Sequence, residues 1–176
     1  MRIRVACDAD LEDLLRVERL AFRRDDEANL VADLLRDPTA LPLLSLLAES
    51  EGRCLGHVLF TAVELVGPAT PVVCSILAPL AVLPEAQGTG VGRALIEEGC
   101  RMLAARGVSL VFVFGSPSYY GRFGFEAANA LGLEAPHPVV PVAAWQVRGL
   151  EAGVVGRARG TVRPAEALAA EALWRE

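Results

Sequence analysis

The sequence predicts an α/β (α+β) fold in which a mixed, mainly antiparallel twisted sheet is flanked by helices. Three apolar runs, at 43–49, 54–66 and 72–83, follow one another closely and predict an antiparallel meander. A fourth apolar run, at 108–114, comes after a predicted helix at 91–106. Because parallel strands need a long crossover connection, this helix predicts that 72–83 and 108–114 form a parallel pair.

The first part of the chain predicts one strand and two helices. Residues 3–6 read as a short strand, and the aspartate at position 8 or 10 then caps a helix whose apolar stripe extends to Phe22. A second helix begins at Asp25 or Asp26 and ends before Pro38, because the residue before a proline disfavours helical geometry.

The last part of the chain predicts shorter elements. Strands are expected around 125–133 and 143–150. Residues 151–176 form a C-terminal extension with a strand at 160–163 and a helix at 166–174. No repeat or linker divides the sequence, so we expect residues 1–176 to form a single domain.

Pro79 lies inside the strongest predicted strand. A proline cannot donate a hydrogen bond to a neighbouring strand, so this strand is either an edge strand or carries a bulge. The strand is long and apolar and continues into a glycine-rich turn, which indicates a central position. The sequence therefore predicts a bulge near Pro79.

Composition excludes several classes of protein. A net charge of −5 argues against nucleic acid as a partner, since binding phosphates requires a basic surface. No apolar run approaches the length of about 20 residues that a membrane span requires, so we expect no membrane partner and a cytoplasmic location. The four cysteines lack metal-binding spacing, which predicts reduced thiols and no metal site. The sequence leaves open whether the chain is a monomer or a homodimer.

A glycine-rich turn joins the strand at 72–83 to the helix at 91–106. Its glycines, Gly88, Gly90 and Gly92, occupy every second position and permit unusual backbone angles and a close approach to a ligand. The first N–H groups of the following helix lack helical partners and lie at its positive end. The turn therefore predicts a phosphate-binding site.

Two common classes of phosphate-binding turn do not fit. A Walker loop requires a lysine, and this chain contains none. A dinucleotide-binding turn requires a third glycine where Arg93 stands. It also requires an acidic residue near the end of the next strand, and 108–114 has none.

Two motifs together resemble the GNAT superfamily of N-acetyltransferases. The pattern Gln-x-x-Gly-x-Gly, filled by Gln87, Gly90 and Gly92, resembles the acetyl-coenzyme A (acetyl-CoA) pyrophosphate loop of that superfamily. Residues 119–126, Tyr-Tyr-Gly-Arg-Phe-Gly-Phe-Glu, resemble the aromatic-Tyr-x-x-x-Gly-Phe segment that follows its fifth strand. The two motifs stand in the expected order, and the resemblance covers roughly residues 44–126.

The resemblance implies a bacterial-type GNAT N-acetyltransferase with acetyl-CoA as cosubstrate. The acceptor would be a small-molecule or peptide amine, attacking the thioester directly in a ternary complex. The resemblance also implies that the parallel pair splays apart to admit the pantetheine arm. The residues expected to bind acetyl-CoA are Leu80, Ala81, Val82, Gln87, Gly88, Thr89, Gly90, Val91, Gly92, Arg93 and Ser116. For Ser116, capping of the next helix is the alternative.

The resemblance also implies catalytic roles. Tyr120 falls at the position whose hydroxyl approaches the coenzyme A sulfur, and a packed aromatic is its alternative. Glu64 is the candidate base, although a solvated strand end would have the same pattern, and His57 lies upstream on the same strand. In this superfamily the first two helices line the acceptor pocket, but we interpret the acidic run at 25–27 as a solvated helix start. A regulatory module that senses acyl-CoA and turns over weakly is the alternative function.

Overall fold

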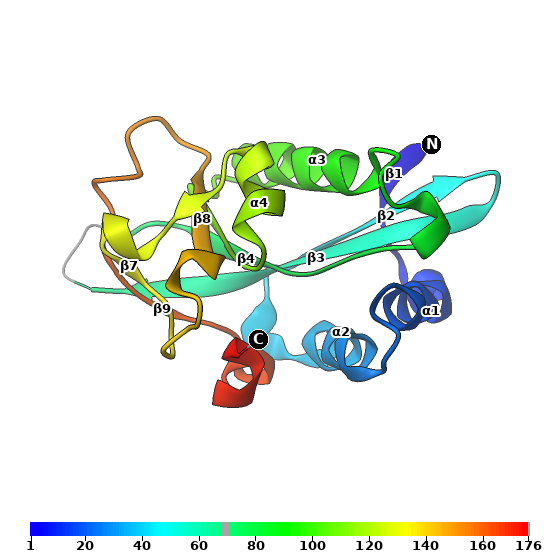
Figure 1. The fold of residues 1–176 in the computed structure, drawn as a ribbon, viewed down its shortest axis with the longest axis horizontal. Helices are drawn as coiled ribbons and strands as arrows, with labels where there is room; N and C mark the ends of the chain where they lie inside the picture. The colour runs from blue at the N-terminus through cyan, green and yellow to red at the C-terminus, as the bar shows by residue number, and fades with distance from the viewer. Residues whose placement is uncertain (68–70, 176) are drawn as a thin grey trace.

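The computed structural model describes residues 1–67 and 71–175 (Figure 1). Among these residues no helix combines the length and the apolar composition that a membrane crossing requires. The helices are α1 (Leu11–Phe22), α2 (Asp26–Arg36), α3 (Val91–Ala105) and α4 (Pro117–Tyr120). The strands are β1 (Arg2–Val5), β2 (Leu44–Ser50), β3 (Arg53–Val66), β4 (Cys74–Val82), β5 (Leu110–Phe114), β6 (Glu126–Ala127), β7 (Leu133–Glu134), β8 (Trp145–Gly149) and β9 (Gly160–Arg163).

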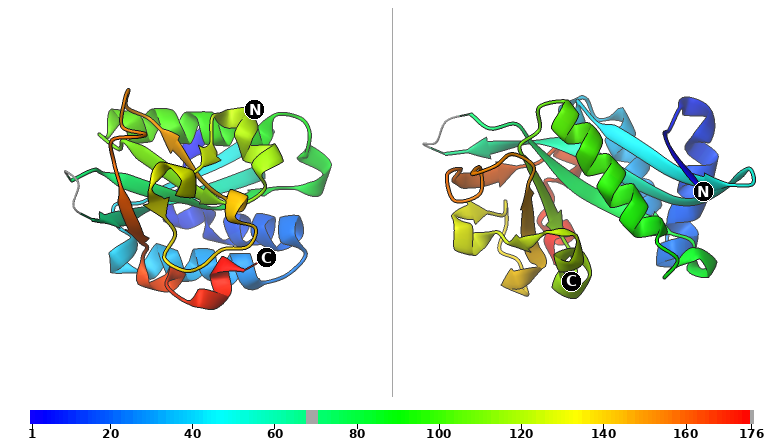
Figure 2. Two further views of the ribbon diagram at one scale, coloured as in Figure 1. Left: turned by 60° about the vertical axis from the view of Figure 1, so that its left-hand side comes forward. Right: turned by 90° about the horizontal axis from the view of Figure 1, so that it is seen from above.

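The strands form the mixed sheet that the sequence predicts. Their order is β1-β2-β3-β4-β5-β8-β6, and β9 pairs with both β3 and β7. Among the described pairs, β4 with β5 and β7 with β9 are parallel and the others are antiparallel. Helix α3 covers one face, while α1, α2 and the C-terminal segment lie on the other (Figures 1 and 2). Figure 2 also shows α3 running obliquely across the strands.

The predicted bulge in β4 is confirmed. The register of β3 against β4 shifts between Val58 and Phe60, whose partners on β4 are Leu80 and Leu77. Only one residue separates Val58 from Phe60, whereas two separate their partners, and one of those two is Pro79. The extra residue bends the strand where the ladder is interrupted.

The splay between β4 and β5 is also present. The two strands pair from Cys74 opposite Leu110 to Leu77 opposite Val113. Strand β4 then continues to Val82 without a partner on the β5 side. The bulge therefore marks the point where the parallel pair opens and leaves a slot beside the second half of β4.

A buried polar chain links α1 to the centre of the sheet. The Nδ1 atom of His57 lies 2.6 Å from Oε1 of Glu18, and its Nε2 atom lies 2.9 Å from the hydroxyl of Ser45. Glu18 and His57 are completely buried, and burial raises the pKa of the Glu18 carboxyl. Among the described residues, Oε2 of Glu18 has no hydrogen-bond partner. The contacts from Glu18 through His57 to Ser45 fix α1 against β2 and β3.

The strand predicted around 125–133 is much shorter in the structure. Only β6 and β7 are extended, and a 3-10 turn (Asn129–Leu131) separates them. Gly132 follows this turn with φ of 77°, in the left-handed region, which breaks a continuous strand.

The helix predicted at 166–174 is replaced by two 3-10 turns, Glu166–Leu168 and Glu171–Trp174. The carbonyl oxygen of Leu168 accepts a hydrogen bond from the indole of Trp174 at 2.8 Å. The carbonyl oxygen of Ala169 is 2.7 Å from Nε2 of His137. These tertiary bonds occupy the carbonyl groups that a continuous helix would have used.

Asp10 is expected to make stability depend on pH. Its carboxylate accepts two bonds of 2.8 Å from Arg4 and one of 2.7 Å from the Cys7 amide. The Arg4 guanidinium, followed by the amide, holds the pKa of Asp10 well below its usual range. Asp10→Asn should therefore lower the free energy of unfolding by about 2 kcal/mol at neutral pH.

The difference between this variant and the wild type should shrink with acid. A depressed pKa gives stability that is present above the unfolded value of about 3.9 and is lost as pH falls toward the folded value. Urea unfolding near neutral pH and below about pH 4 measures both quantities. Asp8→Asn, at an exposed site nearby, is the matched control. Two outcomes would contradict this role of Asp10. One is an equal loss of unfolding free energy in Asp10→Asn and Asp8→Asn, and the other is a difference between Asp10→Asn and the wild type that does not depend on pH.

Candidate functional site

The glycine-rich turn forms an anion cradle at the start of α3. Gly88 and Gly90 have φ of 75° and 93°, in the left-handed region where a side chain would be strained. The first helical bond runs from the Ala94 amide to the Gly90 carbonyl at 3.0 Å, so the N–H groups of residues 91–93 precede it. These donors lie at the positive end of a helix of 15 residues.

Side chains of the turn hold it in place. The amide of Gln87 donates to the Val82 carbonyl at 3.1 Å and ties the turn to the end of β4. The hydroxyl of Thr89 donates to the Ala86 carbonyl at 2.6 Å. These two bonds tie the turn to β4 and to its own backbone.

Two glycines allow the tyrosines of α4 to enter the slot beside β4. A Cβ atom on Gly92 would stand 2.2 Å from the hydroxyl of Tyr119, and one on Gly115 would stand 2.6 Å from the ring of Tyr120. The two tyrosine rings pack edge to face, with their centroids 5.0 Å apart. Any larger residue at either glycine would push a tyrosine out of position.

Two adjoining hollows follow the open side of β4. The first, here called the loop hollow, measures about 380 Å³ and is lined by Leu80, Val82, Ala86, Gln87, Gly88, Gly92, Tyr119 and Tyr120. The second, here called the main groove, also measures about 380 Å³. Leu80 and Tyr120 line both, so the two hollows lie side by side along β4.

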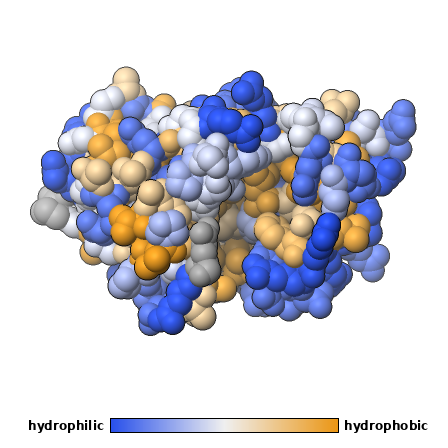
Figure 3. Space-filling model, in the orientation of Figure 1, coloured by the Kyte–Doolittle hydropathy of each residue, from blue (hydrophilic) through white to orange (hydrophobic). Residues whose placement is uncertain are grey.

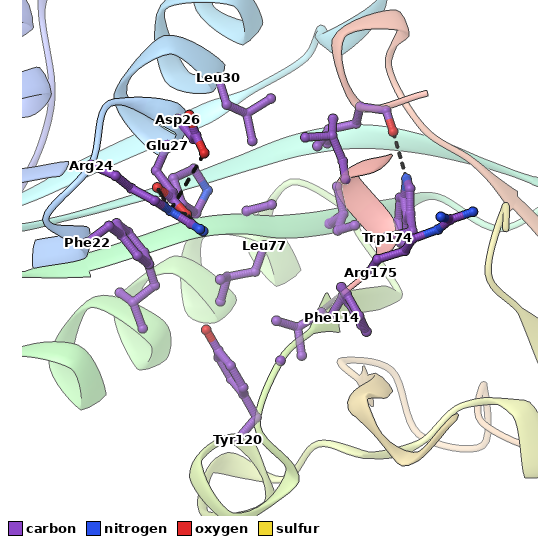
Figure 4. A pocket seen from close by; sticks show the side chains of 18 residues that line it. Phe22, Arg24, Asp26, Glu27, Leu30, Leu77, Phe114, Tyr120, Trp174 and Arg175 are labelled. Carbon is purple, nitrogen blue, oxygen red and sulfur yellow. Dashed lines mark hydrogen bonds and ion pairs between the residues drawn. The ribbon is translucent and has the colours of Figure 1, made fainter. Parts of the chain in front are cut away.

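The main groove lies where four parts of the chain meet (Figure 4). Its walls come from the corner between α1 and α2, the bulged part of β4, the end of β5 with α4, and the C-terminal segment. Figure 3 shows apolar surface in the hollow between the α3 side and the α2 side, with hydrophilic residues around it. The lining residues used below are Phe22, Arg24, Asp26, Glu27, Leu30, Leu77, Phe114, Tyr120, Leu168, Leu173, Trp174 and Arg175.

The hydroxyl of Tyr120 points into the main groove, toward Leu77 and Phe22 (Figure 4). Within residues 1–67 and 71–175 this hydroxyl has no hydrogen-bond partner. Burial raises its pKa, with a smaller contribution from Tyr119. Tyr120 therefore remains a neutral hydrogen-bond donor over the ordinary range of pH.

Acidic residues of the α1–α2 corner also line the groove. Both carboxylate oxygens of Glu27 accept bonds from Arg24, two of them at 3.0 and 3.1 Å, and the Glu27 side chain is only 13% exposed. Asp26 has a looser contact of 3.9 Å with Arg24. The interpretation of 25–27 as a solvated helix start thus holds for Asp25 and for Asp26, whose side chains are 73% and 77% exposed, and is wrong for Glu27.

The predicted acetyl-CoA-binding residues fall into three groups. Leu80, Val82, Gln87, Gly88 and Gly92 line the loop hollow, as stated above. A second group lies beside the loop hollow without lining it. It consists of Ala81 on β4 and of Thr89, Gly90, Val91 and Arg93 on the cradle. The side chains of Ala81 and Val91 are buried in the core. Ser116 lies outside both hollows, at the exposed start of α4, with its hydroxyl 2.9 Å from that of Ser118.

The structure does not bring Glu64 to the groove. The end of β3 pairs with β9, and Glu64 stands opposite Arg163, with which it forms an ion pair. Its side chain is 62% exposed and is not among the described residues that line either hollow. The expectation that Glu64 faces the reacting atoms is therefore wrong, because β3 crosses into the second part of the sheet before it reaches this residue.

The comparisons with known proteins agree with this geometry. Residues 2–128 match the family model of the acetyltransferase (GNAT) domain. The protein YjhQ of Escherichia coli K12, named an uncharacterized N-acetyltransferase, is 46% identical over 147 residues, which cover 82% of this chain and 81% of YjhQ.

Two solved structures share the fold over nearly the whole chain. One is the GNAT family N-acetyltransferase YhbS of E. coli in complex with CoA, with a TM-score of 0.86 and 31% identity over 97% of this chain and 92% of YhbS. The other is a GNAT family acetyltransferase of Brucella melitensis in complex with acetyl-CoA, with a TM-score of 0.76 and 30% identity over 95% of this chain and 97% of that protein. Because the family match takes in most of the chain and agrees with both structures, the chain belongs to the GNAT family of acetyltransferases.

Proposed function

We propose that this protein transfers the acetyl group of acetyl-CoA to a primary amine by direct attack in a ternary complex. The observation that carries the proposal is that the loop hollow and the main groove share Leu80 and Tyr120, and we infer that they join there into one channel. A cosubstrate entering from the cradle and an acceptor entering through the main groove would meet at those two residues.

The cradle fits the pyrophosphate of acetyl-CoA. Residues 91–93 offer N–H groups that precede the first helical bond, and Gly88 and Gly90 keep the approach open. The unpaired half of β4, at Leu80–Val82, would accompany the pantetheine arm. Two similar proteins were solved with CoA or acetyl-CoA, which supports this assignment.

The reaction forms a bond between the amine nitrogen and the acetyl carbonyl carbon as the carbon–sulfur bond breaks. Bound acetyl-CoA supplies the thioester. The amine must lose a proton, and the departing sulfur must gain one. The channel contributes first by aligning the two reactants, an effect on the order of 7–11 kcal/mol when the geometry is good.

Tyr120 is assigned to the departing sulfur. A buried tyrosine with a raised pKa is a weaker acid than a thiol of pKa about 8.5, so full proton transfer to the thiolate would be uphill. We therefore assign Tyr120 as a hydrogen-bond donor that stabilises the developing negative charge on sulfur.

The proton on the amine needs a different route. Glu27 lines the groove and is a better candidate for receiving it than the distant Glu64. A dedicated base is not required, because binding an amine of pKa about 10.4 as the free base costs roughly 4.6 kcal/mol near pH 7. Alignment alone can offset that cost.

A panel of primary amines tests the proposal directly. The purified protein is incubated with acetyl-CoA and each amine, and both thiol release and acetylated amine are measured. We expect release that depends on the amine and matches the product formed. Saturable acetyl-CoA binding without turnover of any amine would contradict the proposal and favour an acyl-CoA sensor.

Gly90→Asp is expected to weaken acetyl-CoA binding about 100-fold or more. The change places a negative charge beside the pyrophosphate at a position with φ of 93°, and like-charge contacts cost several kcal/mol. Isothermal titration measures the affinity. Gly153→Asp is the matched control, because Gly153 has a similar φ of 77° and no atom near its Cβ position. Unchanged affinity for acetyl-CoA in a folded Gly90→Asp protein would mean that the cradle does not bind the pyrophosphate.

A further inference from the structure

The C-terminal segment completes the main groove from outside the matched family domain. The family match ends at residue 128, and the cradle and Tyr120 all precede that point. Leu168, Leu173, Trp174 and Arg175 nevertheless line the groove opposite the α1–α2 corner (Figure 4). The residues assigned to chemistry and this wall therefore come from different parts of the chain.

The wall is held firmly against the end of β5. The ring of Trp174 stacks on Phe114, with centroids 6.1 Å apart, and meets Trp145 edge to face at 5.5 Å. The segment is also tied to the loop after α2. Its amides at Glu166 and Ala167 donate to the Thr39 hydroxyl and the Asp37 carboxylate at 2.8 and 2.9 Å.

The exposed surface of the wall consists mainly of Leu173 and Arg175, of which Leu173 supplies the apolar part. Leu173 is 42% exposed although it lines a groove, and it faces a volume that Leu30 and Phe22 border from the other side. Such an exposed side chain gains free energy when an apolar group covers it. A volume of about 380 Å³ lies at the lower end of the range for small-molecule sites.

The charges of the groove disfavour an acidic acceptor. Arg24 is bound to Glu27, and Arg175 forms an ion pair with Glu171. The charged side chains that line the groove, Arg24, Asp26, Glu27 and Arg175, sum to zero, so no net positive charge awaits a carboxylate of the acceptor. A carboxylate entering the apolar part of the groove would lose water without an excess of positive charge to compensate, so the groove suits an amine with an uncharged body.

We propose that the C-terminal segment is the specificity wall of this enzyme and that the acceptor is a small primary amine on an apolar body without a carboxylate. The inference rests on the proposed acetyl transfer. Leu173 contacts the acceptor body, and Trp174 fixes the wall on which Leu173 stands.

Three amines of equal length provide the test: hexylamine, its ω-hydroxy analogue and its ω-carboxylate analogue. We expect the wild type to prefer hexylamine by about tenfold in kcat/KM over the hydroxy analogue, and by more over the carboxylate. Leu173→Ala should lower kcat/KM for hexylamine by about tenfold and leave ethylamine, which is too short to reach the wall, nearly unchanged. Leu173→Arg should reverse the order by improving the carboxylate analogue, a gain that misfolding cannot produce.

Leu20→Ala is the matched control, because Leu20 is a leucine with 47% exposure on α1 that does not line the groove. Equal turnover of the three amines, or an equal loss for hexylamine and ethylamine in Leu173→Ala, would overturn the specificity wall and leave acetyl transfer standing. Acetylation of hydrophilic amines alone would likewise overturn the specificity wall and leave acetyl transfer standing. Failure to acetylate any amine in the panel would overturn both proposals.

Discussion

Tyr120→Phe is expected to lower kcat by about ten- to a thousandfold while the affinity for acetyl-CoA changes little. The substitution keeps the ring that packs against Tyr119 and Phe125, with centroids 5.0 and 5.6 Å away, and deletes only the hydroxyl. The lost interaction is the proposed hydrogen bond to a sulfur that would become negative as the reaction proceeds. Steady-state kinetics with a turned-over amine, together with titration of acetyl-CoA, measures both quantities.

Tyr119→Phe is the control, since its hydroxyl lies beside Gly92 in the loop hollow and not in the main groove. Its kcat should fall severalfold at most.

The activity of the wild type should also rise with pH as the amine loses its proton. No alkaline decline from Tyr120 is expected below about pH 10, because burial raises the tyrosine pKa above that value. If Tyr120→Phe and Tyr119→Phe lowered kcat equally, Tyr120 would not be the hydrogen-bond donor to the departing sulfur.

His57→Ala is expected to lower the free energy of unfolding by about 3–5 kcal/mol, a large part of the 5–15 kcal/mol typical of a domain. The variant leaves the Glu18 carboxylate buried without its imidazole partner and removes the partner of the Ser45 hydroxyl. Burial raises the pKa of Glu18, so it is the ionised form of Glu18 that is destabilised when the imidazole is removed. The deficit should therefore be greatest near neutral pH and should shrink in acid, where the carboxyl is protonated.

Two other variants separate a charge effect from a cavity effect. His137→Ala removes the other histidine, which is half-buried and bonds the Ala169 carbonyl oxygen, and should cost only about 1 kcal/mol. A triple variant, Glu18→Leu with His57→Leu and Ser45→Ala, replaces the whole polar chain by apolar groups and should recover most of the loss. Urea unfolding gives all the values. A triple variant as unstable as His57→Ala would mean that the polar chain itself stabilises the fold.

Local features of the sequence were enough to predict the frame of the site. The bulge follows from a single proline in a long apolar strand, since Pro79 cannot donate to a ladder. The cradle follows from the spacing of Gly88, Gly90 and Gly92 in front of a helix. Both are properties of a few neighbouring residues, so tertiary packing does not change them.

The far walls of the site depend on contacts that sequence patterns do not encode. The sequence makes Glu64 the candidate base because it is a carboxylate near the end of a predicted strand, but in the structure this end of β3 pairs with β9. The C-terminal wall depends on Trp174 meeting Phe114, and on the bonds that replace the predicted helix by 3-10 turns. The position of Glu27 in the groove depends on how the α1–α2 corner meets β4.

The measurement that tests the account most directly is the two-substrate initial-velocity pattern with acetyl-CoA and an accepted amine. Because the proposed channel would bring both reactants together at Leu80 and Tyr120, the account predicts intersecting double-reciprocal lines. It also predicts no stoichiometric burst of thiol when the amine is left out. Parallel lines, with a protein that gains the mass of one acetyl group in the absence of amine, would contradict direct transfer in a ternary complex.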